Sequence, residues 1–143
     1  MRIDLPDVNV LTALFVVGHP DHRRAQTWFN QAETVATTPI TQAGLLRMLL
    51  NGSINANPDP TRARQAVSAL LSAPSVVFWP DATGNVGQSA FMYALTGHRQ
   101  VTDLHLLSLA ASYGGRLVTF DTKIEAALRP KDRRHVQVLN PAE

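Results

Sequence analysis

Hydrophobic residues follow two alternating patterns along this chain. Short runs rich in Val and Ile are separated by longer stretches in which apolar residues recur every three or four positions. The short runs are typical of buried strands, and the longer stretches are typical of amphipathic helices. Strands that alternate with crossover helices pair in parallel, so the pattern predicts an α/β fold with a mainly parallel sheet of about five strands. The predicted strands cover residues 2–6, 34–37, 75–79, 116–120 and 135–139.

Capping residues, glycines and prolines mark the ends of the predicted helices. Asp21 and Asp59 precede two of them, and Pro39 opens a third. Thr102 or Asp103 is expected to cap a later one. With their caps and stop signals included, the helical stretches cover residues 8–15, 21–31, 39–52, 59–71, 84–97 and 103–115.

Length and composition fit one domain over residues 1–143. Hydrophobic residues make up 45% of the chain and charged residues 17%, which favours a packed core over disorder. The absence of cysteine excludes disulfides, thiol catalysis and cysteine-ligated zinc. No apolar run approaches the roughly 18 residues of a membrane span, and no signal peptide is recognisable, so we expect a cytoplasmic protein without membrane contact.

Acidic and amide side chains lie where predicted strands end and predicted helices begin. Asp7 follows the first strand and Asp121 the fourth, while Gln42 and Asp103 lie at helix starts. Ligands of an open parallel sheet bind outside the carboxyl ends of its strands, so we expect these four side chains to share one cleft. Carboxylates that meet in a cleft repel one another unless a hard cation lies between them. The sequence therefore predicts a Mg²⁺ (or Mn²⁺) site, suited to phosphodiester cleavage.

Two neighbouring polar residues are candidates for orienting the carboxylates. Asn9 follows Asp7 by two positions, and Thr119 precedes Asp121 by two on the same strand face. Side chains of this kind hydrogen bond to metal ligands and fix their orientation. Asp4 alternates with apolar neighbours in the first strand, so we expect it on the solvent side or in an edge contact, outside the site; a role in orienting the metal ligands is the alternative.

Four motifs give the chain a more specific resemblance. They are "DVNVL" at 7–11, "TPITQAGLLRML" at 38–49, "VTDLHLLSLA" at 101–110 and "GRLVTFD" at 115–121. In their order and spacing over nearly the whole chain they resemble the PIN-domain ribonucleases, and more narrowly the VapC-type toxins of bacterial toxin-antitoxin pairs. The resemblance implies a three-layer α/β/α sandwich that cleaves RNA with a metal-activated water, leaving 5′-phosphate and 3′-hydroxyl ends. By resemblance, three acids of the family's metal-binding quartet fall on Asp7, Asp103 and Asp121.

The fourth quartet position departs from the family pattern, because Gln42 stands where the motif resembles "TPITEAGLLR". The amide keeps the shape and the carbonyl oxygen of a glutamate but lacks its charge. One charge pair at about 4 Å and an effective dielectric near 20 contributes roughly 4 kcal/mol, so weaker metal binding and reduced activity are expected. Natural divergence or a deliberate substitution that lets a toxic nuclease be produced would each account for it, and we favour the second.

The resemblance also implies partners. The substrate is RNA, a VapB-type antitoxin inserts a C-terminal segment into an apolar groove, and the protein forms a homodimer. A second hypothesis takes Gln42 as the mark of a non-catalytic RNA-binding or antitoxin-binding module that has lost hydrolysis. Cleavage by the Gln42→Glu variant distinguishes the two hypotheses.

Overall fold

The computed structural model describes residues 1–82 and 84–140 of the chain. Within these residues five strands form one sheet in the order β3-β2-β1-β4-β5, and every neighbouring pair is parallel. The predicted parallel sheet is therefore confirmed, and β1 lies at its centre. The strands are β1 Ile3–Pro6, β2 Thr34–Thr37, β3 Val76–Phe78, β4 Arg116–Thr119 and β5 Val136–Val138.

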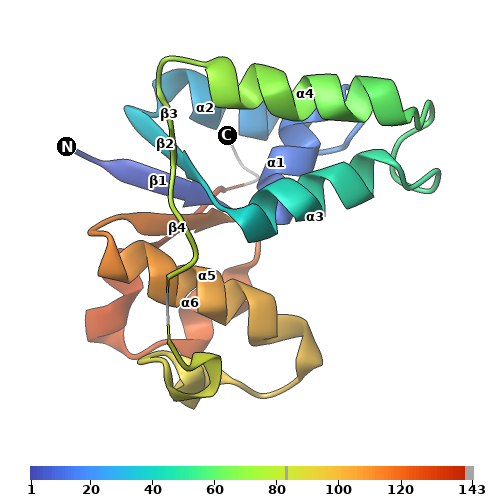
Figure 1. Ribbon diagram of the computed structural model, residues 1–143. Helices are drawn as coiled ribbons and strands as arrows, with labels where there is room; N and C mark the ends of the chain where they lie inside the picture. The colour runs from blue at the N-terminus through green and yellow to red at the C-terminus, as the bar shows by residue number, and fades with distance from the viewer. Residues whose placement is uncertain (83, 141–143) are drawn as a thin grey trace.

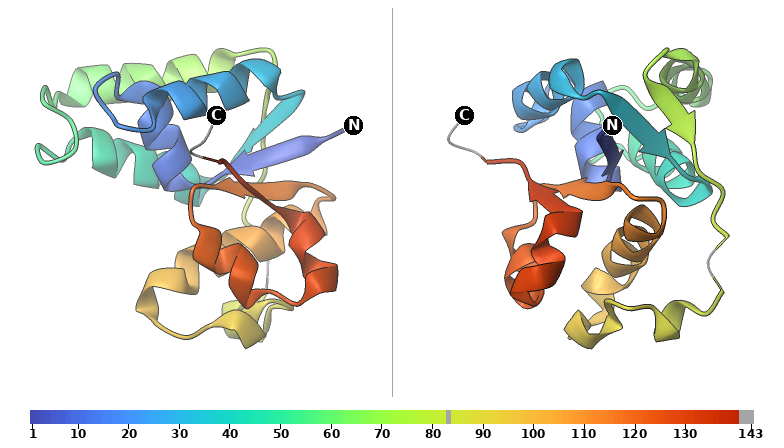
Figure 2. Two further views of the ribbon diagram at one scale, coloured as in Figure 1. Left: turned by 180° about the vertical axis from the view of Figure 1, so that it is seen from behind. Right: turned by 90° about the vertical axis from the view of Figure 1, so that its left-hand side faces the viewer.

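Helices cover both faces of the sheet (Figure 1). Helices α1 to α4 lie on one face, and α5 and α6 lie on the other, as the rear and side views of Figure 2 also show. Apolar clusters fill both interfaces, so the three-layer α/β/α sandwich is confirmed. The helices are α1 Val8–Phe15, α2 His22–Gln31, α3 Pro39–Leu49, α4 Pro60–Ser72, α5 Val101–Ser112 and α6 Thr122–Ala127.

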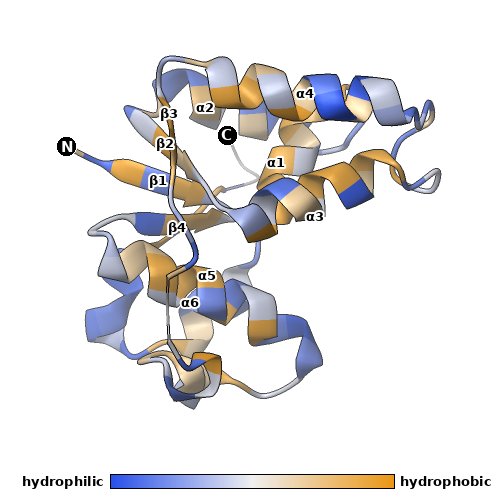
Figure 3. Cartoon of the chain, in the orientation of Figure 1, coloured by the Kyte–Doolittle hydropathy of each residue, from blue (hydrophilic) through white to orange (hydrophobic). Residues whose placement is uncertain are grey.

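The strands contribute alternate residues to the two cores. Leu5 and Leu117 pack with residues of α5 and α6 on one side of the sheet. Val35 and Val118 pack with residues of α1 and α2 on the other. Figure 3 shows apolar residues in β1 and along much of α3, while polar residues are more frequent on α4. The central strands are thus buried on both faces, as a parallel sheet between two helix layers requires.

Helices α1 and α3 pack closely because Gly44 has no side chain. A β-carbon at Gly44 would lie 2.4 Å from Val8 Cγ2 and 3.0 Å from Val8 Cγ1. The N-cap residues of the two helices, Asp7 and Thr38, directly follow the neighbouring strands β1 and β2. The close approach therefore holds the first turn of α3, which contains Gln42, at the same end of the sheet as Asp7.

The helix predicted over residues 84–97 is wrong. The described part of this segment contains short 3₁₀ turns at Val86–Gln88 and Met92–Ala94, and a further one follows at His98–Gln100. Phe91 and Ala94 are buried in the core beneath α5, whereas other apolar side chains of the segment stay exposed. The apolar residues thus act as separate anchors and do not form one continuous helix face.

One predicted cap differs from the structure. Helix α5 begins at Val101 with Gln100 at its N-cap, so Thr102 and Asp103 both lie inside the first turn and neither caps it. Asp21 is the N-cap residue of α2, as predicted, but its carboxylate forms an ion pair with Arg24 and makes no capping hydrogen bond.

The expectation that Asp4 faces solvent is wrong, because its side chain is fully buried. Its Oδ2 accepts a hydrogen bond from Trp28 Nε1 at 2.8 Å, and its Oδ1 accepts one from Arg116 Nε at 2.9 Å. Arg2 lies 3.6 Å from the same oxygen. These partners compensate the desolvation of the carboxylate, which an apolar site would not tolerate.

Among residues 1–82 and 84–140, none of the helices combines the length and the apolar character that crossing a bilayer requires.

Candidate active site

Asp7 is the most firmly held acid at the carboxyl end of the sheet. It directly follows β1 and is the N-cap of α1, where its Oδ1 accepts a hydrogen bond from the Val10 N–H at 2.8 Å. Its Oδ2 accepts one from the Thr119 hydroxyl at 2.6 Å. Only 2% of the residue is exposed. Both oxygens are therefore fixed before any ligand arrives.

Thr119 ties a second acid to the first. Its hydroxyl donates to Asp7 and accepts a hydrogen bond from the Asp121 N–H at 3.1 Å. Asp121 is the N-cap of α6, and its Oδ1 accepts from the Lys123 N–H at 2.8 Å. One threonine at the end of β4 thus couples the positions of two carboxylates that come from different strands.

Asp103 completes the acidic group from the first turn of α5. Burial and the negative charges of Asp7 and Asp121 raise its pKa to about 7. The pKa of Asp7 is raised as well, mainly by burial and to a smaller extent by Asp121, although the hydrogen bond from Thr119 opposes the shift. The three predicted acids therefore lie within one another's electrostatic field at one end of the sheet.

Gln42 occupies the first turn of α3, half-buried. Its Nε2 donates a hydrogen bond to Thr37 Oγ1 at 3.2 Å. The start of this helix is rigid, because Thr38 and Thr41 form a reciprocal capping box. A glutamate at position 42 has no N–H and would be unable to donate to Thr37, so the amide fits this hydrogen-bonding environment.

Asn9 contributes to the site through its backbone N–H and not, as predicted, through its side chain. The side chain is exposed, and the backbone N–H of Asn9 hydrogen bonds to Asp7, which lowers the pKa of that carboxyl. The backbone at the start of α1 therefore supplies the hydrogen bond that we expected from the amide.

The donor chemistry of the site suits a hard divalent cation. All candidate donors are oxygens, from the three carboxylates and the carbonyl of Gln42. Within residues 1–82 and 84–140, no three His, Asp or Glu side chains lie close enough together to hold one ion as they stand. Burial causes most of the rise in the pKa values of Asp7 and Asp103, and repulsion between the carboxylates adds to it; a bound cation would remove that repulsion.

A pocket of about 450 Å³ opens beside Asp121. Its basic residues are His98 and Arg99 in "GHRQ", just before α5, and Lys123 at the start of α6, and none of them was predicted from the sequence. The sequence signal that could have identified this pocket is the basic pair His98 and Arg99, which lies just before the acidic motif that contains Asp103. The lining residues are Thr96, Gly97, His98, Arg99, Gln100, Asp121 and Lys123.

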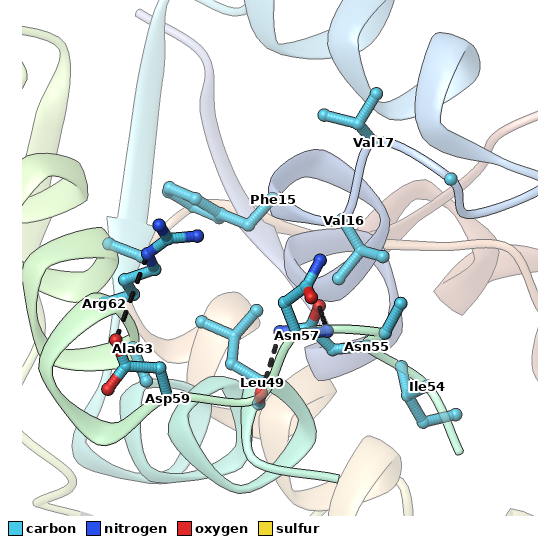
Figure 4. A pocket seen from close by; sticks show the side chains of 13 residues that line it. Phe15, Val16, Val17, Leu49, Ile54, Asn55, Asn57, Asp59, Arg62 and Ala63 are labelled. Atoms are coloured by element: carbon cyan, nitrogen blue, oxygen red, sulfur yellow. Dashed lines mark hydrogen bonds and ion pairs between the residues drawn. The ribbon is translucent and has the colours of Figure 1, made fainter. Parts of the chain in front are cut away.

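A second pocket, of about 480 Å³, lies between the end of α1, the end of α3 and the start of α4 (Figure 4). Phe15, Val16 and Leu49 give it apolar walls. Its charged residues face each other, with Arg62 Nε 3.9 Å from Asp59 Oδ2. The pocket therefore has apolar walls and one pair of opposite charges, Arg62 and Asp59.

Comparison with known proteins places the chain among PIN domains. A family model described as the PIN domain matches residues 5–128. Ribonuclease VapC39 of Mycobacterium tuberculosis H37Rv is 45% identical over 124 residues, which cover 84% of this chain and 89% of the relative. Ribonuclease VapC29 of the same strain is 40% identical over 119 residues, covering 82% and 85%.

Solved structures show the same fold at lower sequence identity. Mycobacterium tuberculosis VapC20, described as a sarcin-ricin loop cleaving toxin, aligns with a TM-score of 0.62 and 17% identity over 87% of this chain and 94% of its own. VapBC2 from Rickettsia felis, bound to a DNA fragment from the promoter, aligns with a TM-score of 0.60 and 15% identity, covering 97% and 100%.

Proposed function

The chain belongs to the PIN-domain family, among its VapC-type ribonucleases, and we propose that it is a metal-dependent endoribonuclease toxin of a type II toxin-antitoxin pair. The observation that carries the proposal is the electrostatic coupling of three acids at the carboxyl end of the sheet: Asp7 and Asp121 raise the pKa of Asp103, and Asp121 raises that of Asp7. Repulsion within such a group destabilises the folded chain, and a bound cation would offset it.

Asp7, Asp103 and Asp121 would hold Mg²⁺ or Mn²⁺ in this proposal, and Gln42 would complete the set with its carbonyl oxygen. A divalent cation held there would supply water activation and stabilisation of the leaving oxygen of a phosphodiester. The protein supplies the orientation: Thr119 and the backbone of Val10 hold the two oxygens of Asp7. Asp103, with its pKa at about 7, carries a proton in part of the metal-free molecules at neutral pH and must release it to act as a ligand.

Gln42 is expected to reduce activity. Its amide carries no charge, and Nε2 is engaged with Thr37. The loss of one charge next to a divalent ion weakens cation binding by an amount on the order of a few kcal/mol. The alternative function, an RNA-binding or antitoxin-binding module without hydrolysis, rests on the same substitution.

Cleavage of a labelled RNA in the presence of Mn²⁺ tests the proposal. We expect slow cleavage by the chain as it stands, faster cleavage by Gln42→Glu, and none by Asp7→Asn. Products should carry 5′-phosphate and 3′-hydroxyl ends. If Gln42→Glu binds RNA but leaves it intact, the non-catalytic module is the correct interpretation.

We propose that the antitoxin binds in the pocket shown in Figure 4. Its walls are apolar, Val17 at its margin is 80% exposed, and the Rickettsia felis VapBC2 structure shows that a relative of this fold is found with its antitoxin. A C-terminal antitoxin segment with apolar side chains fits such walls. The Val17→Asp substitution should weaken capture of a co-expressed antitoxin while RNA cleavage persists.

A homodimer is proposed through the edge of the sheet at β3. Val77 and Phe78 are 39% and 53% exposed on this edge strand, and Leu71 at the end of α4 is 42% exposed. Exposed apolar edge strands are normally covered in soluble proteins. Sedimentation should show a dimer for the chain and a monomer for the Phe78→Asp variant.

A further inference from the structure

We propose that the pocket beside Asp121 binds a phosphodiester of the RNA strand adjacent to the scissile one, with Arg99 and Lys123 as positioning residues. The inference rests on the proposed nuclease function, because it assigns the substrate-binding surface of that same site. Asp121 forms one wall of the pocket and is also a proposed metal ligand. A strand held in the pocket therefore leads directly into the acidic group.

Among the described residues of the protein, the side chains of Arg99 and Lys123 have no ion-pair partner. Arg99 and Lys123 are both exposed, and in the described part of the chain neither forms an ion pair within 4.0 Å. Cations so near an acidic group would ordinarily serve as its counter-ions. Because they do not pair with Asp121, their charge is available to an anion from outside.

The backbone that carries Arg99 is held in place by Gln100. Its Oε1 accepts hydrogen bonds from the Thr96 N–H at 2.7 Å, the Thr96 hydroxyl at 2.8 Å and the Gly97 N–H at 3.2 Å. The backbone of Lys123 is held as well, because its N–H donates to Asp121 Oδ1. Both cations are thus carried by ordered backbone in segments that line the pocket.

Size and charge distinguish this pocket from the one in Figure 4. A volume of about 450 Å³ lies within the range of pockets that hold small ligands, so a nucleotide unit fits. The pocket of Figure 4 has one cation, Arg62, which faces Asp59 at 3.9 Å, and its walls are apolar. Of the two, the pocket beside Asp121 is the one whose chemistry recognises phosphate.

RNA affinity across a salt series tests the inference. The probe is a fluorescein-labelled single-stranded oligoribonucleotide of mixed sequence, with EDTA present to prevent cleavage. We expect Arg99→Ala and Lys123→Ala each to weaken binding roughly 5-fold and to reduce the slope of log K against log salt by about 0.7. Arg99→Lys should restore the slope, because it restores the charge.

The matched control is Arg64→Ala, which removes one exposed arginine from α4 on the opposite face of the sheet (Figure 1). It should leave affinity and slope unchanged. Equal losses of RNA affinity in Arg64→Ala and Arg99→Ala, or an unchanged salt slope in Arg99→Ala, would overturn the inference. Either result would show that RNA binds to diffuse surface charge.

A second readout separates this inference from the nuclease proposal. In the Gln42→Glu background, Arg99→Ala should raise KM several-fold with kcat nearly unchanged, and Mn²⁺ affinity measured by calorimetry should stay within about twofold. If Asp7→Asn abolishes cleavage while Arg99→Ala changes neither KM nor RNA affinity, the pocket assignment fails and the nuclease stands. If no variant cleaves RNA but the salt slopes change as expected, the nuclease fails and the binding pocket stands.

Discussion

The Thr119 hydroxyl makes two hydrogen bonds at the candidate site, to the carboxylate of Asp7 and from the N–H of Asp121. Thr119→Val keeps the shape of the side chain and removes both. We expect the unfolding free energy to fall by about 1–3 kcal/mol, because a buried carboxylate loses a donor. Mn²⁺ affinity should fall about 10- to 100-fold. Thr119→Ser retains the hydroxyl and should stay near the parent in denaturant melts and Mn²⁺ titrations.

Asp103 makes the stability of the metal-free protein depend on pH. Its pKa is about 7 in the folded chain and near its ordinary value of 3.8 when unfolded, so between these values the folded state binds more protons. The contribution of Asp103 to stability is therefore highest below about pH 4, falls as pH rises to about 7, and levels off above that. Asp7, whose pKa is also raised, adds to the same trend.

Asp103→Asn should flatten this dependence. With chelator present, we expect the variant to exceed the parent in unfolding free energy at pH 8 by an amount on the order of 2 kcal/mol, and to approach it near pH 4. Urea melts at both pH values measure the difference. A constant difference at both pH values would show that Asp103 ionises normally.

Gln42 is expected to stabilise the metal-free chain relative to glutamate at the same position. A glutamate would add a fourth negative charge to the acidic group and would lose the hydrogen bond that Nε2 donates to Thr37. Gln42→Glu should lower the melting temperature in chelator by about 3–5 °C. A higher melting temperature for the glutamate form would contradict the expected repulsion.

Asp4 illustrates what sequence analysis can miss at single residues. Its alternation with apolar neighbours indicated a solvent-facing position, yet it is buried against Trp28, 24 positions later, and Arg116, 112 positions later. A local pattern contains no information about such distant partners. Asp7 was identified correctly as lying at the end of a strand because that position is a local property.

At the scale of elements, the contact between α1 and α3 depends on Gly44. Gly44→Ala would place a β-carbon 2.4 Å from Val8 Cγ2. We expect a net destabilisation of about 1–3 kcal/mol, because overpacking exceeds the gain in helix propensity from alanine. Gly52→Ala is the control, since no atom lies within 4 Å of the added carbon. Thermal melts of both variants in chelator make the comparison, and similar melting temperatures would show that Val8 simply moves aside.

The strands and most helices were predictable because their signals are local. Each of the five predicted strands overlaps an observed one, and Pro39, Asp59 and Pro60 begin helices as expected. The segment 84–97 was not predictable in the same way. Its apolar residues have helical spacing, but its glycines weaken a helix, and the buried positions of Phe91 and Ala94 are set by contacts with distant parts of the core.

At the scale of the whole molecule, a bound cation should stabilise the fold. Any ligand that binds only the folded state raises stability, by about 2.7 kcal/mol at 100 times its Kd. We expect Mn²⁺ to raise the melting temperature of the chain, and to raise that of Gln42→Glu further because its site has one more charge. Asp7→Asn should show little shift. An equal shift in Asp7→Asn would indicate that the ion binds elsewhere.

The site as a whole was more predictable than its surroundings. Parallel strands bring their carboxyl ends to one edge, so the acids at strand ends and helix starts could be assigned to one place from the sequence. The basic pocket and the apolar pocket are each formed by segments whose proximity depends on the finished packing. No spacing rule in the sequence connects the turn at His98–Gln100 with Lys123.

The central position of β1 affects how the protein is made. The Thr119 hydroxyl that fixes Asp7 is synthesised 112 residues after it. β1 therefore waits for β4 as its second neighbour, and a nascent chain cannot form the acidic group until β4 has been made. Chains that stop short of β4 would thus lack the complete acidic group.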